Sequence, residues 1–262
     1  MKQRFQTRAA LLEERIETFL KTLTELGGYC TLEQAKRLEV ANSDTRVLAQ
    51  LRGLERSGFL RRVADYPVVY QITASTTRLL GVDRRARRPH GAETVVNRLL
   101  AVSFYLEARR WPVEFTFDHT QKIDTFLLEG CPMSAIPHRG GKPYLRENFV
   151  LWYEENQIGV AIMDHQQRSP LWQLRGLAKR FCRLVGCLGE RLQLLVATGN
   201  ESRHRLYCRL VHHPAVMKLS LPGFAITIKP YQVQRATKSL QLLPRPGSPE
   251  LPSKPLAQTM GP

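Results

Sequence analysis

The sequence predicts a two-part protein of mixed α+β and α/β class. Apolar residues recur at helical spacing in three short segments before residue 58, and a hairpin pattern follows them. A basic stretch with few large apolar side chains then occupies residues 81–92, and helix-like and strand-like segments alternate beyond it. With 262 residues, 43% of them hydrophobic, the chain is large enough to build a core for each part.

The first predicted helix is an amphipathic segment that ends at a pair of glycines. Between residues 12 and 26, apolar side chains stand three and four positions apart, which is typical of one buried helix face, and Gly27 follows. A second, short helix is expected to begin at Thr31. Gln34 stands three residues after this threonine, and that spacing indicates a capping box.

The third predicted helix has one apolar face and one basic face. Asn42 or Ser43 is expected to cap its start, and Gly58 to follow its end. The apolar stripe, placed against the core, consists of Val47, Leu48, Leu51 and Leu54.

Two strand-like segments follow the third helix. They cover residues 59–63 and 68–73, and a turn is expected at residues 65–67 between them. A last helix over residues 74–80 closes this part. Helix, helix, helix and hairpin is the order of a winged helix-turn-helix, so residues 1–80 are predicted to form such a DNA-binding domain.

The outward face of the third helix has the composition of a DNA-reading surface. Arg46 and Gln50 stand four residues apart, and arginine can pair bidentately with guanine, glutamine with adenine. These two residues are the predicted base-reading pair. The other predicted DNA contacts are Ser43, Thr45, Arg52 and Arg56 on the helix, and Arg61 and Arg62 in the hairpin. The alternative is that these charges only solvate a surface that contacts protein.

The charge balance also favours a polyanionic partner. The chain has 39 Lys and Arg against 23 Asp and Glu, a formal net charge of +16. Residues 1–90 hold 17 basic and 10 acidic side chains, and the remainder holds 22 and 13, so both parts are basic. A basic excess spread over both parts suggests whole surfaces that face phosphate, and duplex DNA is the predicted partner.

The second part is predicted to be an α/β domain over residues 93–243, joined to the first by a basic linker at residues 81–92. Residues 244–262 contain six prolines and are expected to form a disordered tail. The predicted strands are residues 113–117, 123–128, 149–153, 158–163 and 192–197, and the predicted helices are residues 94–109 and 170–188.

Cysteine usage and hydropathy suggest a cytoplasmic protein. The five cysteines show no CxxC spacing, so they are expected to be reduced and not to bind a metal ion. No apolar run reaches the roughly 18 residues of a membrane span, so no membrane partner is expected.

Four segments of the chain resemble the replication-relaxation family of plasmid and conjugative-element proteins. These segments are residues 51–60 (LRGLERSGFL), 70–73 (YQIT), 122–127 (KIDTFL) and 194–198 (LLVAT) before Arg203. The resemblance implies a winged helix joined to an α/β domain of the PD-(D/E)XK nuclease type. In that fold, acidic groups on adjacent strands hold Mg²⁺ and a lysine orients the attacking water.

The nuclease pattern implied by the resemblance is incomplete in this chain. Asp124 stands at the first acidic position. If Asp164 is the second acid, Gln166 replaces the lysine; if Asp164 takes the lysine's place, Ile162 stands where an acid belongs. A degenerate, non-catalytic nuclease domain without a cofactor is therefore expected.

The predicted function is a sequence-specific DNA-binding accessory protein of a mobile genetic element. It would act at an origin of transfer or replication and position a partner such as a relaxase or a replication enzyme. Two alternatives stay open. One is a transcriptional repressor, which would act as a symmetric homodimer. The other is a Mg²⁺-dependent nuclease that uses Asp124, Asp164 and Gln166.

Overall fold

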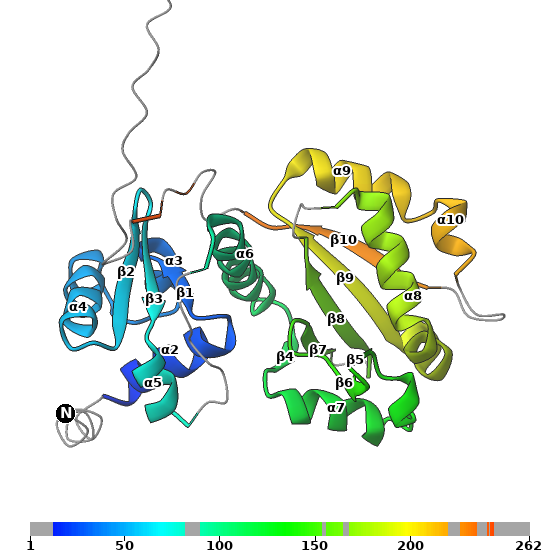
Figure 1. Cartoon of the computed structure of the whole chain (residues 1–262), viewed down its shortest axis with the longest axis horizontal. Helices are drawn as coiled ribbons and strands as arrows, with labels where there is room; N and C mark the ends of the chain where they lie inside the picture. The colour runs from blue at the N-terminus through cyan, green and yellow to red at the C-terminus, as the bar shows by residue number, and fades with distance from the viewer. Residues whose placement is uncertain are drawn as a thin grey trace, which may run out of the picture.

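The protein has a mixed α+β fold with several sheets (Figure 1). The computed structural model describes residues 13–81, 90–153, 156–164, 168–219, 226–234, 240 and 242–243. Most of the predicted basic linker, at residues 82–89, and the whole predicted tail, residues 244–262, lie outside the described residues. None of the helices within the described ranges is long and apolar enough to cross a membrane.

The N-terminal part combines short helices with a small antiparallel sheet. Its sheet has the strand order β1-β3-β2, and its helices pack around a core that contains the fully buried Leu20 and Leu51. The predicted helices and hairpin of this part are confirmed. In chain order the elements are α2 (Glu14–Glu25), β1 (Tyr29–Thr31), α3 (Leu32–Arg37), α4 (Asp44–Arg56), β2 (Leu60–Asp65), β3 (Val68–Ile72) and α5 (Ala74–Leu79).

Local signals account for the ends of these helices. The Thr31 hydroxyl accepts a hydrogen bond from the backbone N–H of Gln34, and the Gln34 side chain accepts one from the backbone N–H of Thr31, so the predicted capping box is present. Ser43 stands at the N-cap of α4, although its side chain makes no capping hydrogen bond. Gly58 follows α4 with φ of +79°, a conformation that favours glycine.

The second part is built on a five-stranded sheet with the order β10-β9-β8-β7-β4. Strands β8, β9 and β10 are parallel, whereas β7 and β4 run antiparallel to their neighbours. Helix α8 connects the parallel pair β8 and β9. The elements are α6 (Ala92–Ala108), β4 (Val113–Thr116), α7 (His119–Leu128), β5 (His138–Arg139), β6 (Lys142–Pro143), β7 (Phe149–Tyr153), β8 (Ile158–Met163), α8 (Pro170–Leu188), β9 (Leu192–Thr198), α9 (Glu201–Leu210), α10 (Pro214–Met217) and β10 (Ile228–Gln232), with 3-10 turns at Met133–Ala135 and Gly189–Arg191.

Helices cover both faces of the large sheet. Along β8, Val160 and Ile162 belong to the core that also contains residues of α7 and α8, whereas Ala161 and Met163 belong to the core formed with α6. This alternation follows from the two-residue period of a strand. Because both faces are covered, β8 is apolar along its whole length, as expected for a buried parallel strand.

Helix α6 contacts both sheets, and Figure 1 shows it between them. Its first half carries Val95 and Leu99 into a cluster with Tyr29 of β1, and its second half packs on the large sheet. The buried Gln34 side chain adds a polar connection. Its Nε2 donates to the carbonyl oxygen of Leu99 at 2.8 Å and to Ser103 Oγ at 2.9 Å.

The end of the described chain returns to the N-terminal sheet. Leu242 forms an isolated antiparallel bridge with Ala64 of β2, and the backbone N–H of Leu243 donates to the carbonyl oxygen of Val63 at 2.8 Å. The end of the described chain therefore lies along β2, an edge strand of the small sheet.

The strand predicted for residues 123–128 is wrong, because this segment is part of helix α7. The Asp118 carboxylate caps the helix by accepting hydrogen bonds from the backbone N–H groups of Thr120 and Gln121. Lys122 and Phe126, four residues apart, are buried on one face. A short apolar run does not distinguish a strand from one buried helix face, which explains the error.

Candidate nucleic-acid interface

The predicted DNA-reading residues of α4 lie on its outward face. Val47, Leu51 and Leu54 are buried against the core, and Leu48 is half-buried. Opposite them, the side chains of Arg46 and Arg52 are exposed and that of Gln50 is half-buried. The remaining predicted contacts on this helix are all exposed: Ser43, Thr45 and Arg56.

Few of these side chains are engaged within the protein. No hydrogen bond or ion pair is made by the side chains of Arg46, Gln50 or Arg52 in the described part of the chain. The Arg56 Nε donates only a long hydrogen bond, 3.4 Å, to the carbonyl oxygen of Arg52. Donors on this face are therefore left to solvent or to a ligand.

Acidic groups near α4 lie close to its ends. Asp44 is in the first turn and pairs with Lys36 of α3, with 2.5 Å between Oδ1 and Nζ. A carboxylate there stabilises the helix, because the helix N-terminus carries partial positive charge. Glu55, in the last turn, is half-buried. Residues 45–54 of α4 thus contain no acidic residue, and Glu55 is the acidic residue next to Arg56 in the sequence.

The two hairpin arginines have different surroundings. Arg61 is half-buried, and its guanidinium donates from Nε and Nη2 to Gln71 Oε1 of β3 at 2.9 and 2.7 Å. Arg62 is exposed and pairs with Asp65 on the same strand. At the tip of the hairpin, the Tyr66 side chain is 83% exposed, so an aromatic ring projects into solvent there.

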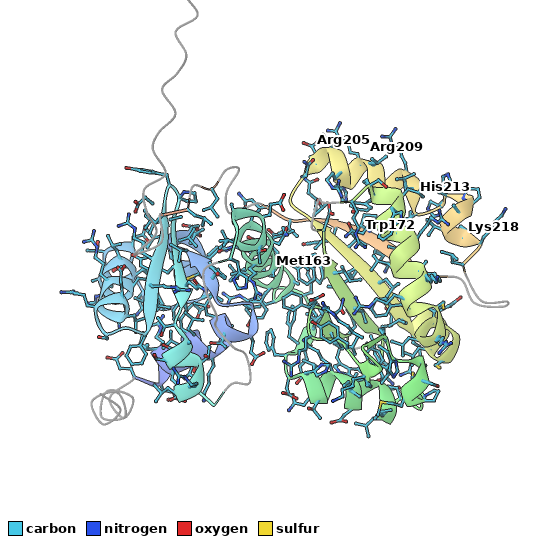
Figure 2. All side chains as sticks on the ribbon, viewed as in Figure 1. Met163, Trp172, Arg205, Arg209, His213 and Lys218 are labelled. Carbon is cyan, nitrogen blue, oxygen red and sulfur yellow. The ribbon has the colours of Figure 1, made fainter. Side chains whose placement is uncertain are left out.

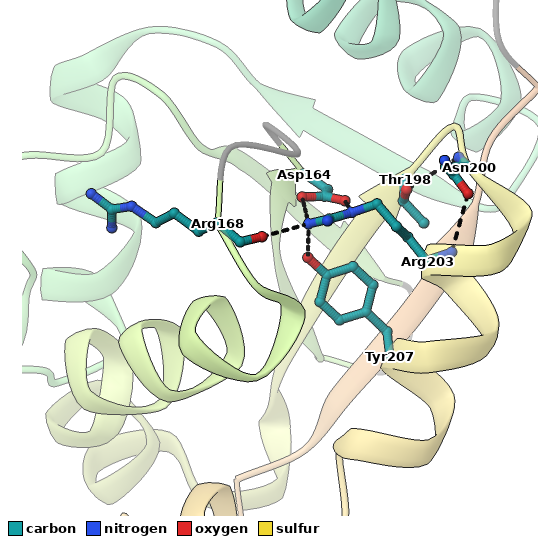
Figure 3. Close-up of polar contacts among 6 residues, drawn as sticks. All are labelled: Asp164, Arg168, Thr198, Asn200, Arg203 and Tyr207. Carbon is teal, nitrogen blue, oxygen red and sulfur yellow. Dashed lines mark hydrogen bonds and ion pairs between the residues drawn. The ribbon is translucent and has the colours of Figure 1, made fainter.

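The carboxyl end of β8 carries a buried ion pair that the sequence did not predict (Figure 3). Asp164 directly follows β8 and has no exposed surface. Arg203 of α9 binds both carboxylate oxygens, through Nε to Oδ2 at 2.5 Å and Nη2 to Oδ1 at 2.8 Å. This side-on, bidentate geometry is the strong form of an Arg–carboxylate pair.

Three further contacts hold Arg203 in this position. Its Nη2 donates to the carbonyl oxygen of Arg168 at 3.0 Å and to the Tyr207 hydroxyl at 3.3 Å. Its backbone N–H donates to the Asn200 side chain, which caps α9. Burial, followed by the nearby Asp164 carboxylate, raises the pKa of Tyr207 further above its ordinary value.

The acidic residues of the implied nuclease site do not fit a magnesium site. Asp124 lies on the exposed face of α7 and not on a strand, which corrects the strand-based expectation. Asp164 directs both oxygens to Arg203, and Gln166 lies outside the described residues. Within the described ranges, no group of three or more His, Cys, Asp or Glu side chains is arranged to hold a metal ion.

The pairing of Asp164 with Arg203 could not be read from the sequence. The two residues are 39 positions apart, and no spacing rule connects them. The available signal was weaker: a polar residue at the carboxyl end of one predicted strand, and an arginine shortly after the end of another. Parallel neighbouring strands bring such ends to the same edge of a sheet.

Comparison of the chain with family models, with curated proteins and with solved structures found no match.

Proposed function

We propose that the protein binds duplex DNA through its N-terminal part, with α4 in the major groove. The observation that carries the proposal is the unengaged polar face of α4. Arg46, Gln50 and Arg52 present donors toward solvent while the opposite face of the helix is buried. Base edges and phosphates would satisfy these donors, with Arg46 and Gln50 at bases and Arg52 and Arg56 nearer the backbone.

The arrangement around α4 supports a winged helix-turn-helix interpretation. Helix α4 packs on α3 and on the core of α2, and the β2–β3 hairpin follows it directly. In this interpretation the hairpin is the wing. Arg62 and the exposed Tyr66 would meet the DNA backbone or minor groove, and Arg61 would stiffen the wing through Gln71.

The proposed role is accessory to a second enzyme. The resemblance of four segments to replication-relaxation proteins suggests a mobile element as the setting. The bidentate contact of Arg203 with Asp164 favours a structural role for that carboxylate over a catalytic one. We therefore infer that the protein positions a relaxase or a replication enzyme at origin DNA and does not cut DNA itself.

Selection of binding sites from random duplexes, followed by fluorescence anisotropy, tests the proposal. Arg46→Ala and Gln50→Ala should each weaken binding to the selected site by about 1–3 kcal/mol, roughly 5- to 150-fold, and relax specificity at one base pair. Arg78→Ala is the matched control, because Arg78 is an exposed arginine on α5 of the same part. Equal affinity of Arg46→Ala and wild type for every duplex would refute base reading by α4.

Salt dependence and cleavage assays separate the alternatives. With six to ten phosphate contacts, affinity should fall by about 10³-fold or more between about 50 and 200 mM salt. Duplex that stays intact with Mg²⁺ supports the accessory role. Cleavage that is lost in Asp124→Asn would overturn that role in favour of a nuclease, and a palindromic footprint would favour a repressor dimer.

A further inference from the structure

A groove lies beside α8, and no residue of α4 lines it. It has a volume of about 350 Å³, within the range of ligand pockets. One wall is α8, and the other includes Asn148, directly before β7, and Ile162 near the end of β8. The groove therefore opens beside the carboxyl end of a parallel strand, where open α/β sheets bind ligands.

An exposed tryptophan lies at one end of this groove. Trp172 is in the first turn of α8 (Figure 2), and its side chain is 53% exposed. The Arg168 guanidinium lies 4.1 Å from the centroid of its ring. The indole is held by this contact, yet half of the side chain remains open to a planar partner. A nucleobase is such a partner, because every base has a π face.

A half-buried cation, Arg180, forms part of the groove wall. Arg180 donates from Nη2 to the carbonyl oxygen of Tyr144 at 3.0 Å and to Asn148 Oδ1 at 3.2 Å, both neutral acceptors. Glu147 also lines the groove, but its Oε1 already accepts from Arg139 and from the Tyr144 hydroxyl. Among the described residues, Arg180 therefore forms no ion pair with a carboxylate. Burial lowers the pKa of Arg180, and Glu147 is near enough to oppose that shift. A phosphate would supply a direct anionic partner.

The exposed face of α8 continues this positive charge. Trp172, Lys179 and Arg183 share a face, because they stand seven and eleven residues apart along the helix, and Arg175 lies beside them. The helix contains no acidic residue. Eleven residues of helix extend for about 16 Å, which is roughly the length of five stacked nucleotides at 3.4 Å each.

We propose that the α8 groove binds a short stretch of single-stranded DNA, with one base stacked on Trp172 and phosphates against Arg180, Arg175 and Lys179. Paired bases in a duplex have their faces covered by neighbouring pairs, so the stacking requires an unpaired base. The site uses no residue of α4, and the inference does not rest on duplex binding by α4.

Gly176 offers a clean way to test the groove. It lines the groove in the middle of α8, and a Cβ added there would meet no atom within 4 Å. The position has room for a Cβ, so Gly176→Phe is expected to place its ring in the groove. Gly176→Ala adds one methyl group and improves helix propensity, so it is the matched control.

The measurement is anisotropy of a labelled oligothymidylate of about 12 nucleotides, a length within known single-strand site sizes. Trp172→Ala and Gly176→Phe should each weaken binding by about tenfold or more, whereas Trp172→Phe and Gly176→Ala should stay near wild type. Thermal unfolding of each variant confirms that it is folded. Wild-type affinity in both Trp172→Ala and Gly176→Phe would overturn the proposal, as would equal competition by polyglutamate.

A second comparison makes the two surfaces distinguishable. Arg46→Ala should leave oligothymidylate binding unchanged, and Gly176→Phe should leave duplex binding unchanged. Loss of oligothymidylate binding in Arg46→Ala, with Gly176→Phe unaffected, would assign single-strand binding to α4 and refute the α8 site.

Discussion

Asp164 and Cys30 illustrate how single residues are constrained by burial. Asp164 has no exposed surface, and Arg203 pairs with both of its carboxylate oxygens. Cys30 lies in the N-terminal core, also with no exposed surface. Burial therefore makes the charge pairing of Asp164 and the protonation of Cys30 depend on the folded state.

Asp164→Asn should lower the free energy of unfolding by about 3–5 kcal/mol, because it leaves the Arg203 guanidinium without its counter-ion in a largely buried site. Urea denaturation measures this change. Asp124→Asn is the matched control, since Asp124 is exposed on α7 and should change stability by no more than about 0.5 kcal/mol. Equal stability of the two variants would show that the Asp164 pair is not a stabilising contact.

The buried thiol of Cys30 leads us to expect that the protein loses stability at alkaline pH. Burial raises the pKa of the Cys30 thiol to about 12, whereas the pKa of a thiol in the unfolded chain is about 8.5. Above that pH the unfolded chain releases a proton that the folded chain retains. The free energy of unfolding should then fall by up to about 1.4 kcal/mol per pH unit until the pH approaches the folded value.

Denaturation of Cys30→Ala between about pH 9 and 10.5 isolates this contribution, because the variant lacks the thiol and its stability should fall less steeply. The exposed Cys208 supplies the control variant Cys208→Ala. Parallel pH profiles of wild type and Cys30→Ala would contradict the linkage.

Among the elements, α4 and α8 each contain a glycine that no packing requires. A Cβ at Gly53 or at Gly176 would meet no atom within 4 Å. Gly53 stands seven residues after Arg46 and three after Gln50, so it shares the outward face of α4 with both. A glycine at such a position would let the backbone of a helix in the major groove approach the DNA more closely, because no side chain stands between them.

Gly53→Ala should raise the free energy of unfolding by up to about 1 kcal/mol, because alanine is the better helix former. It should also weaken duplex binding if α4 lies in the major groove. Gly176→Ala should give a similar gain in stability with unchanged duplex affinity. Thermal unfolding and anisotropy measure the two effects, and unchanged duplex binding in Gly53→Ala would argue against close approach at that face.

In the whole molecule, α6 connects the small sheet to the large one. Its first half packs on β1 and β2, and its second half on the five-stranded sheet. Gln34 contacts it through two hydrogen bonds while also completing the capping box of α3. The buried Gln34 side chain thus both caps α3 and holds the N-terminal part against α6.

Gln34→Leu should lower the free energy of unfolding by about 1–3 kcal/mol. The buried backbone N–H of Thr31 and the Ser103 hydroxyl would each lose a hydrogen-bond partner. Limited proteolysis should also cut the variant faster than wild type. Gln121→Leu, at an exposed position of α7, provides the control for an added apolar side chain. Wild-type stability and wild-type proteolysis of Gln34→Leu would contradict a connecting role.

The sequence by itself determined the features that depend on near neighbours. The Thr31–Gln34 capping box, the glycine after α4 and the β2–β3 hairpin are all decided within a few residues, so local patterns predicted them. The amphipathic period of α4 likewise predicted which of its faces would be outward, because burial of one helix face follows from the spacing of apolar residues.

The tertiary structure decided what depends on distant partners. Residues 123–128 belong to helix α7, and the core takes up Lys122 and Phe126 from one face of that helix. The Asp118 cap is a local signal, but the choice between a strand and a buried helix face depends on this packing. Asp164 meets Arg203 only because β8 and β9 are parallel neighbours whose ends share one edge. The α8 groove also depends on strands β7 and β8. Contacts between residues far apart in the chain are set by the packing of whole elements, and no short pattern in the sequence encodes them.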